Sequence, residues 1–165
     1  MIPDTLLARY RTAGVLVDTN LLLLYFVGAL DPDRIPRFKR TNTFTPEDHA
    51  LLRRFLGRFE RVVTTPHILA EVSNLAGELS GAVRDGVFAK FAAGITLMEE
   101  RHAPAAELAA QPSFPRFGLT DTAVVHHARG RYLVLSDDFR LSQYLQHQGV
   151  DVINFNHLRL YNLLQ

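Results

Sequence analysis

Acidic side chains occur at four places in the sequence where an apolar strand ends or an amphipathic helix begins. The first is Asp18, in the otherwise apolar segment GVLVDTNLLLLYF at residues 14–26. A carboxylate carried into a protein core loses its hydration, and it stays charged only if cations or hydrogen-bond donors replace that water. The other three acids are Glu71, Asp121 and Asp138.

These four acids are expected to meet at one edge of the molecule. Asp18 and Asp138 each follow an apolar, strand-like segment, so parallel strands would place both at the carboxyl edge of a sheet. Glu71 falls on the apolar stripe of an amphipathic helix, and Asp121 lies one turn before inward-facing residues of another. Four carboxylates in one concave site repel one another, and bound Mg²⁺ or Mn²⁺, which prefer oxygen ligands, would offset that repulsion. Because such ions activate water and neutralise charge on a phosphoryl group, phosphodiester hydrolysis is the leading reaction class.

Three neutral polar side chains beside the acids are expected to support them. Thr19, Asn20 and Ser136 would orient the carboxylates or bind water on the ion. Considered singly, each acid also has a structural explanation: the aspartates as helix caps or turn residues, and Glu71 as the partner of a buried arginine. It is the conjunction of four acids that favours a metal site.

The elements that position these residues are predicted to alternate between strands and helices. Buried parallel strands are predicted at residues 14–17, 61–64, 132–135 and 150–155. Helices are predicted at about residues 20–28, 46–58, 65–79, 121–129 and 139–148. Three threonines are expected to be N-caps: Thr45, Thr65 and Thr120. This order predicts a single domain over 1–165 with a three-layer α/β/α fold around a parallel sheet of four or five strands.

The remaining segments are assigned to packing or to loops. Apolar residues at helical spacing between 82 and 108 are expected to pack in the core. Residues 31–43 and 111–118 lack periodicity and are predicted to be loops near the site. The seven histidines are expected to have surface or capping roles, since the adjacent His126 and His127 diverge on a helix and cannot share an ion.

The sequence resembles the PIN domain family over nearly its whole length. The resemblance is carried by VLVDTN at 15–20, TPHILAEV at 65–72, LTDTAVVHHA at 119–128 and VLSDDFRL at 134–141. It implies a metal-dependent endoribonuclease that cuts single-stranded or structured RNA, with Mg²⁺ or Mn²⁺ as cofactor. The catalytic and metal-binding acids of the family match Asp18, Glu71, Asp121 and Asp138.

The resemblance implies roles for the adjacent acids Asp137 and Asp138 of the last motif, and it also implies binding partners. The family has a threonine, any residue and an aspartate, so Ser136 takes the threonine place, Asp138 the acid place, and Asp137 becomes a spacer or supporting residue. Either aspartate stays open as the fourth ligand. Because many relatives are toxins of bacterial toxin–antitoxin pairs, a cognate antitoxin is an implied partner, and a homodimer is a further one to test.

The chain differs from compact relatives in residues 28–48. If the protein cuts RNA, the basic residues of this stretch are expected to bind its backbone, namely Arg37, Lys39 and Arg40. Phe38 or Phe44 would then stack on an unpaired base, and the competing interpretation is that these rings cover the core or a dimer contact.

Composition narrows the remaining classes of function. The chain has no cysteine, which excludes disulfides, thiolate catalysis and cysteine-based zinc sites, and a net charge of +1 gives no global attraction to nucleic acid. Residues 15–30 are too short and too polar at Asp18 to span a membrane, so a cytoplasmic location without membrane contact is expected. The alternative function is a non-catalytic PIN-fold module that binds RNA or protein.

Overall fold

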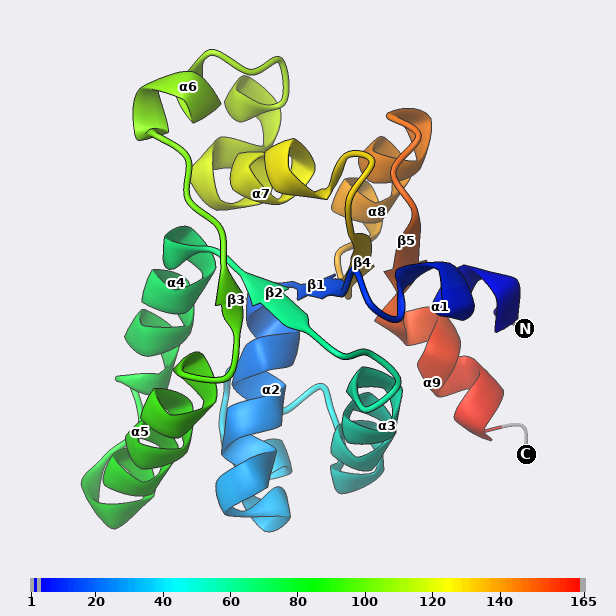
Figure 1. The fold of residues 1–165 in the computed structure, drawn as a ribbon. Helices are drawn as coiled ribbons and strands as arrows, with labels where there is room; N and C mark the ends of the chain where they lie inside the picture. Colours follow the sequence, from blue (N-terminus) through cyan, green and yellow to red (C-terminus); the bar gives the residue numbers. More distant parts are fainter. Residues whose placement is uncertain (1, 3, 164–165) are drawn as a thin grey trace.

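A five-stranded, all-parallel sheet forms the centre of the protein, in the order β3-β2-β1-β4-β5 (Figure 1). The computed structural model describes residue 2 and residues 4–163. Its strands are β1 (Val15–Val17), β2 (Val62–Thr64), β3 (Glu99–Glu100), β4 (Leu133–Ser136) and β5 (Val152–Asn154). In the central strand, Leu16 is opposite Val63 on β2 and Val134 on β4, and all three side chains are fully buried. Such apolar strands are typical of parallel sheets covered on both faces.

Helices cover both faces of this sheet. Helices α2, α3, α5 and α9 lie on one side and α6, α7 and α8 on the other (Figure 1). The helices are α1 (Asp4–Tyr10), α2 (Thr19–Leu30), the 3₁₀ helix η1 (Pro32–Arg37), α3 (Pro46–Leu56), α4 (Pro66–Ala76), α5 (Gly81–Ile95), α6 (Ala105–Ala109), α7 (Phe114–Ala128), α8 (Phe139–His147) and α9 (Phe155–Leu163). The predicted α/β fold with a central parallel sheet is confirmed. None of the helices in the described part of the chain has the length and apolar character needed to cross a bilayer.

Two of the predicted N-caps hold their helices as expected. The Thr45 hydroxyl accepts a hydrogen bond from the Asp48 N–H at 3.2 Å, and the Asp48 carboxylate accepts one from the Thr45 N–H at 2.9 Å, which completes a capping box at α3. At α4 the Thr65 hydroxyl accepts from the Ile68 N–H at 3.2 Å. Each threonine precedes a proline, whose missing N–H costs nothing in the first turn.

The predicted loop at 111–118 is helical from Phe114 onward, and the predicted cap at Thr120 is wrong. Helix α7 already begins at Phe114, and it bends at Gly118, which has φ 78° and ψ −171°. A residue without Cβ adopts these angles at little cost, so the helical path breaks there and restarts. Thr120 therefore lies within α7, where its hydroxyl donates to Glu71 instead of capping the helix.

The predicted loop at 31–43 is partly ordered as helix, and both its Phe38 and the following Phe44 belong to the core. Helix η1 occupies much of this segment. Phe38 is 6% exposed and Phe44 is 4% exposed, with the Phe44 ring 6.3 Å from that of Phe155. The prediction that these rings stack on bases is therefore wrong, and the competing core interpretation is confirmed. Burying such apolar rings in the core is more favourable in free energy than exposing them to water.

The expectation of surface or capping roles fails for two histidines. His49 and His127 are each 4% exposed. His49 Nε2 lies 3.2 Å from the Tyr25 carbonyl oxygen, and its ring fits against α2 because Gly28 has no Cβ there. Burial lowers the pKa of His49, and burial lowers the pKa of His127 to about 4, so neither ring favours its charged form.

Arg159 of α9 fixes the segment that leads from η1 to α3. Its guanidinium donates to the Thr43 carbonyl at 2.8 Å and pairs with Asp48 at 2.9 Å, and it lies over the Phe44 ring. The segment that carries the basic residues of the stretch 28–48 is thereby tied to the C-terminal helix.

Candidate active site

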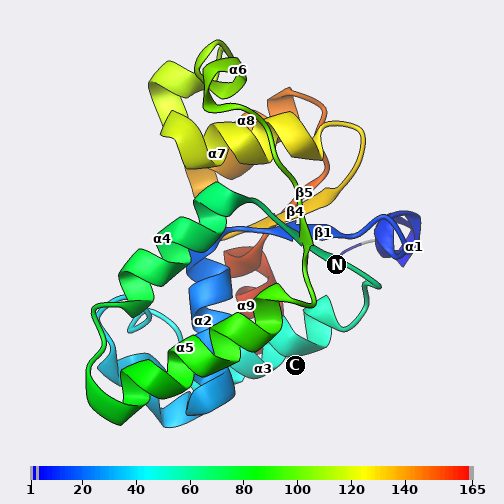
Figure 2. The same cartoon turned by 60° about the vertical axis from the view of Figure 1, so that its left-hand side comes forward.

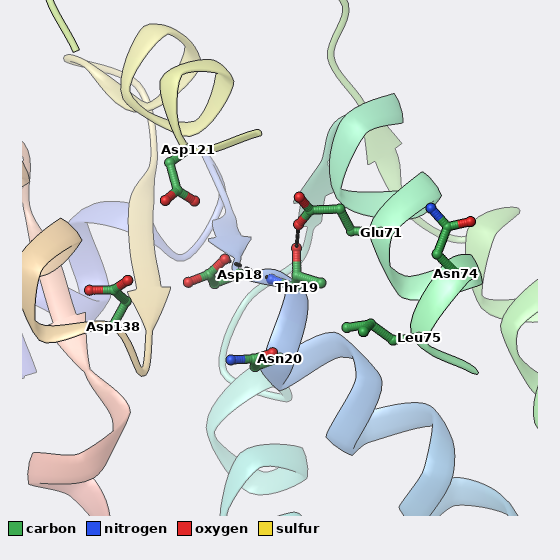
Figure 3. Close-up of a pocket in the computed structure, with 8 residues that line it drawn as sticks. All are labelled: Asp18, Thr19, Asn20, Glu71, Asn74, Leu75, Asp121 and Asp138. Carbon is green, nitrogen blue, oxygen red and sulfur yellow. Dashed lines mark hydrogen bonds between the residues drawn. The ribbon is translucent and has the colours of Figure 1, made fainter. Parts of the chain in front are cut away.

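A pocket of about 380 Å³ opens where the parallel strands end (Figure 3). It is lined by Asp18, Thr19, Asn20, Glu71, Asn74, Leu75, Asp121 and Asp138. The pocket thus brings together all four predicted acids, which come from the junction of β1 with α2, from α4, from α7 and from the start of α8. Ligands of open α/β sheets bind at this edge of the fold, because the chain turns there from strand to helix.

Asp18 is held by backbone and hydroxyl donors at the end of β1. Its N–H donates to the Leu135 carbonyl at 3.0 Å, which extends the pairing with β4 by one residue. Its Oδ1 accepts from the Thr19 N–H at 2.7 Å, and its Oδ2 accepts from the Ser136 hydroxyl at 2.6 Å. Asp18 is therefore the N-cap of α2 as well as a pocket residue, so the structural explanation and the site coexist.

Burial is the largest influence on the charge of Asp18. Only 8% of the residue is exposed, and this desolvation raises the pKa of Asp18 to about 6. The hydrogen bond from Ser136 lowers that pKa, and the neighbouring charge of Asp137 raises it. The expected supporting role of Ser136 is thus a physical one, because the hydroxyl stabilises the charged carboxylate.

Glu71 accepts hydrogen bonds from two threonine hydroxyls on different helices. The Thr19 hydroxyl of α2 donates to Oε2 at 2.9 Å, and the Thr120 hydroxyl of α7 donates to Oε1 at 2.8 Å. Figure 3 shows the Glu71 carboxylate reaching from α4 toward Thr19. Among the described residues no arginine pairs with Glu71, so the structural alternative for this acid fails.

Asp121 shows that the four carboxylates act on one another. Burial raises its pKa to about 7, and the charges of Asp18, Asp138 and Glu71 add to that rise in this order. The side chain points from α7 toward the same space as Asp18 and Asp138 (Figure 3). A cation in this space would oppose the repulsion that favours the protonated form of Asp121.

Of the adjacent acids Asp137 and Asp138, only Asp138 lines the pocket. Asp138 lines the pocket and caps α8, where its Oδ1 accepts from the Leu141 N–H at 3.0 Å. Asp137 Oδ2 instead lies 3.4 Å from Asn20 Nδ2, and its carbonyl accepts from Asn156 at 3.0 Å. This placement favours Asp138 as the fourth acid and Asp137 as a supporting residue.

The types of side chain in the pocket suit a divalent cation, but the spacing of the acids does not. Carboxylate, hydroxyl and amide oxygens are ligands that Mg²⁺ and Mn²⁺ prefer. Within residues 2 and 4–163, however, no three His, Cys, Asp or Glu side chains lie close enough together to hold a metal ion. The acids would have to draw together to share one.

The three basic residues predicted to contact RNA lie outside the pocket. Arg37 ends η1 and is exposed. Lys39 Nζ lies 2.7 Å from Glu78 Oε2, and Arg40 Nη2 lies 2.6 Å from Glu78 Oε1. Glu78 follows the end of α4, so these two cations lie beyond Asn74 along the helix that carries Glu71.

Sequence reasoning missed three residues of the site. Asn74 and Leu75 line the pocket from α4, and Thr120 holds Glu71 from α7. Asn74 and Leu75 lie three and four positions after Glu71, so helical periodicity alone places them on the same face. The signal for Thr120 was hidden because a threonine before an acid is also typical of an N-cap.

No protein-family model matches the chain, and no match is found among curated proteins. A function is therefore inferred from the pocket and from the residues that form it.

Proposed function

We propose that the protein is a metal-dependent endoribonuclease of the PIN domain type, which hydrolyses phosphodiester bonds of single-stranded or structured RNA. One observation carries the proposal: four carboxylates from four separate parts of the chain line one pocket at the carboxyl edge of a parallel sheet. Placing so many acids together without a cation is unfavourable: burial raises the pKa of Asp121 most, and the charges of the other three acids raise it further.

The chain's own residues prepare this pocket for phosphodiester chemistry. Bound Mg²⁺ or Mn²⁺ would supply Lewis acidity toward a phosphoryl oxygen and toward the attacking water. The Thr19 N–H and the Ser136 hydroxyl hold Asp18 in one orientation. Two threonine hydroxyls do the same for Glu71. Ligands fixed in this way lose little freedom when an ion or substrate binds.

The proposed partners follow from the resemblance. They are RNA, a cognate antitoxin protein and a second copy of the chain. Copurification of an inhibitory protein encoded beside this chain would support the antitoxin, and size-exclusion chromatography would test the homodimer.

The decisive experiment compares two acid variants on labelled single-stranded RNA with Mg²⁺, Mn²⁺ or EDTA. Asp18→Asn is expected to abolish cleavage with an unchanged circular dichroism spectrum, because it removes a charge from the centre of the pocket. Asp85→Asn is the matched control, since that side chain on α5 is 80% exposed and outside the pocket. Undiminished, metal-dependent cleavage by Asp18→Asn would refute the proposal.

The second candidate is a non-catalytic module that binds RNA or protein through the same fold. It is favoured by the separation of the acids, which form no ready-made ion site among the described residues. This candidate predicts a shift in RNA mobility without cleavage under every divalent ion tested. Cleavage that EDTA abolishes would exclude it.

A further inference from the structure

One face of α4 continues past the acidic pocket. Glu71, Asn74, Leu75 and Glu78 follow one another at the spacing of a single helical face. The Glu78 N–H donates to the Leu75 carbonyl at 3.1 Å, so the chain keeps turning after Ala76, where α4 ends. Glu78 therefore lies about 10 Å beyond Glu71 along this direction.

Two cations meet at Glu78 from a distant segment of the chain. Lys39 Nζ lies 2.7 Å from its carboxylate, and Arg40 binds both carboxylate oxygens, at 3.0 Å through Nε and 2.6 Å through Nη2. The next residue, Thr41, is fully buried, and its hydroxyl donates to the Ile35 carbonyl at 2.8 Å. The two cations are thus presented by an anchored backbone, which runs beside the end of α4 that is farther from the sheet (Figure 2).

The charges of this cluster do not cancel. Hydrogen bonds from Arg40 and then from Lys39 lower the pKa of Glu78 to about 2, so one full negative charge faces two positive charges. The side chains of Lys39 and Arg40 are 67% and 44% exposed, which leaves donors accessible to a ligand. Exposed ion pairs of this kind are weak and exchange readily with another anion.

The pocket and this cluster have complementary roles for a polyanion. The pocket is lined by four acids and four neutral residues, so it repels phosphate groups beyond those that an ion binds. A nucleic acid strand consequently needs cations outside the pocket, and phosphate contacts of that kind supply most of its affinity.

We propose that a single-stranded RNA substrate leaves the acidic pocket along α4, past Asn74 and Leu75, and that its phosphates bind Lys39 and Arg40 in competition with Glu78. The inference rests on the proposed function and adds to it the path of the RNA and the cations that bind its phosphates. It gives Glu78 a role opposite to that of the pocket acids, since Glu78 restrains substrate binding.

The test measures binding of a short fluorescein-labelled single-stranded RNA by anisotropy in the Asp18→Asn background with Mg²⁺. Replacing Lys39 and Arg40 together with alanine is expected to weaken binding by about tenfold and to lower the salt slope by about 0.7 for each phosphate that is no longer bound. Glu78→Gln is expected to strengthen binding by about threefold, because it removes the competing anion. In the otherwise wild-type chain these changes are expected in KM, with kcat unchanged.

The matched control for Glu78→Gln is Asp151→Asn. Asp151 also pairs with an exposed arginine, Arg9, at 3.2 Å, but it precedes β5 and so lies at the opposite edge of the sheet from the pocket. The control makes the same change in net charge and is expected to leave RNA affinity unchanged.

Three results would overturn the proposal. If Glu78 only fixes the segment of Lys39 and Arg40, Glu78→Gln will weaken binding or leave it unchanged. Cleavage by the wild-type chain with an unaltered KM in the double alanine variant would reject the path while the nuclease proposal stands. A wild-type chain that neither binds nor cuts RNA would reject both. Thermal melting of each variant identifies loss of folding, and Glu78→Gln decides the matter if the double variant unfolds.

Discussion

The Ser136 hydroxyl donates a hydrogen bond of 2.6 Å to Asp18 Oδ2, and this bond joins the ends of the adjacent strands β1 and β4. The same oxygen of Ser136 accepts the Asp138 N–H at 3.0 Å. Ser136 is fully buried, so no water competes for either bond. One serine therefore sets the position of two pocket acids relative to each other.

Removing this hydroxyl is expected to damage the pocket more than the fold. Ser136→Ala takes a donor from the Asp18 carboxylate, which raises the pKa of Asp18 further and loosens its orientation. We expect metal affinity or RNA cleavage to fall by about 10- to 100-fold, measured by titrating Mn²⁺ against cleavage rate. Ser113→Ala is the control, because Ser113 is also buried and bonds Thr122 at 3.1 Å. Equal losses in both variants would contradict this role.

Thr120 offers a test of how Glu71 is positioned. Thr120→Val keeps the shape of the side chain but removes the donor to Glu71 Oε1, so we expect a loss of about 10- to 100-fold in cleavage or metal affinity. Thr120→Ser retains a hydroxyl and is expected to restore most of the activity. The two variants are compared at several Mn²⁺ concentrations, and a Thr120→Ser variant as impaired as Thr120→Val would show that the hydroxyl is unimportant.

The raised pKa values of the pocket acids predict how stability depends on pH without metal. Asp18 has a folded-state pKa of about 6 and Asp121 of about 7, against an ordinary value of 3.8 for each. An acid with a raised pKa binds its proton more tightly when folded, so the free energy of unfolding falls as pH rises from about 4 through 6 to 7.

Substitution by asparagine removes this penalty. We expect Asp18→Asn to raise the free energy of unfolding at neutral pH by about 1 to 3 kcal/mol in EDTA, and to leave it nearly unchanged near pH 4. Urea denaturation at the two pH values measures the difference. A variant that is less stable than the wild type at neutral pH would contradict the burial of a charged Asp18.

Divalent ions are expected to reverse the same penalty. Mg²⁺ or Mn²⁺ binds the ionised carboxylates, so the rise in Tm on adding the ion should be larger at about pH 8 than at about pH 5, where protons compete. EDTA should return Tm to its starting value. Asp121→Asn should shrink the rise, whereas Asp85→Asn should leave it intact. An equal rise in the wild type and in Asp121→Asn would place the ion elsewhere.

Hydrophobic patterning was sufficient to predict the central strands of the sheet, but it did not predict several elements at the periphery of the fold. The buried strands β1, β2, β4 and β5 have apolar, β-branched sequences, and each lies within a predicted segment apart from Ser136, which extends β4 by one residue. Strand β3 consists of Glu99 and Glu100 at the sheet edge, where neither alternation nor apolarity marks it. Helices α1, η1, α6 and α9 were not predicted, and α5 was marked only by apolar residues at helical spacing between 82 and 108. Helix α9 begins at Phe155, a residue that the prediction placed at the end of the final strand, in the segment VDVINF at 150–155.

The site was predicted better than the contacts around it. The convergence of the four acids follows from strand and helix order, which sequence reveals. The Glu71 contact to Thr120 lies two residues after the bend at Gly118, which the sequence does not mark as a break within a longer helix. The pairing of Lys39 and Arg40 with Glu78 joins segments 38 or more positions apart, beyond the reach of local patterns.

The order of the strands in the sheet also determines when this pocket can form during synthesis of the chain. Ser136 and Asp18 are 118 positions apart, and β4 must pair with β1 before they meet. On the ribosome, a growing chain therefore carries Asp18 and Glu71 long before it has the serine and aspartate that complete the cluster. Chains that stop before Ser136 and Asp138 lack the assembled centre, so whatever reaction this protein performs begins only after the segment with these two residues has been synthesised.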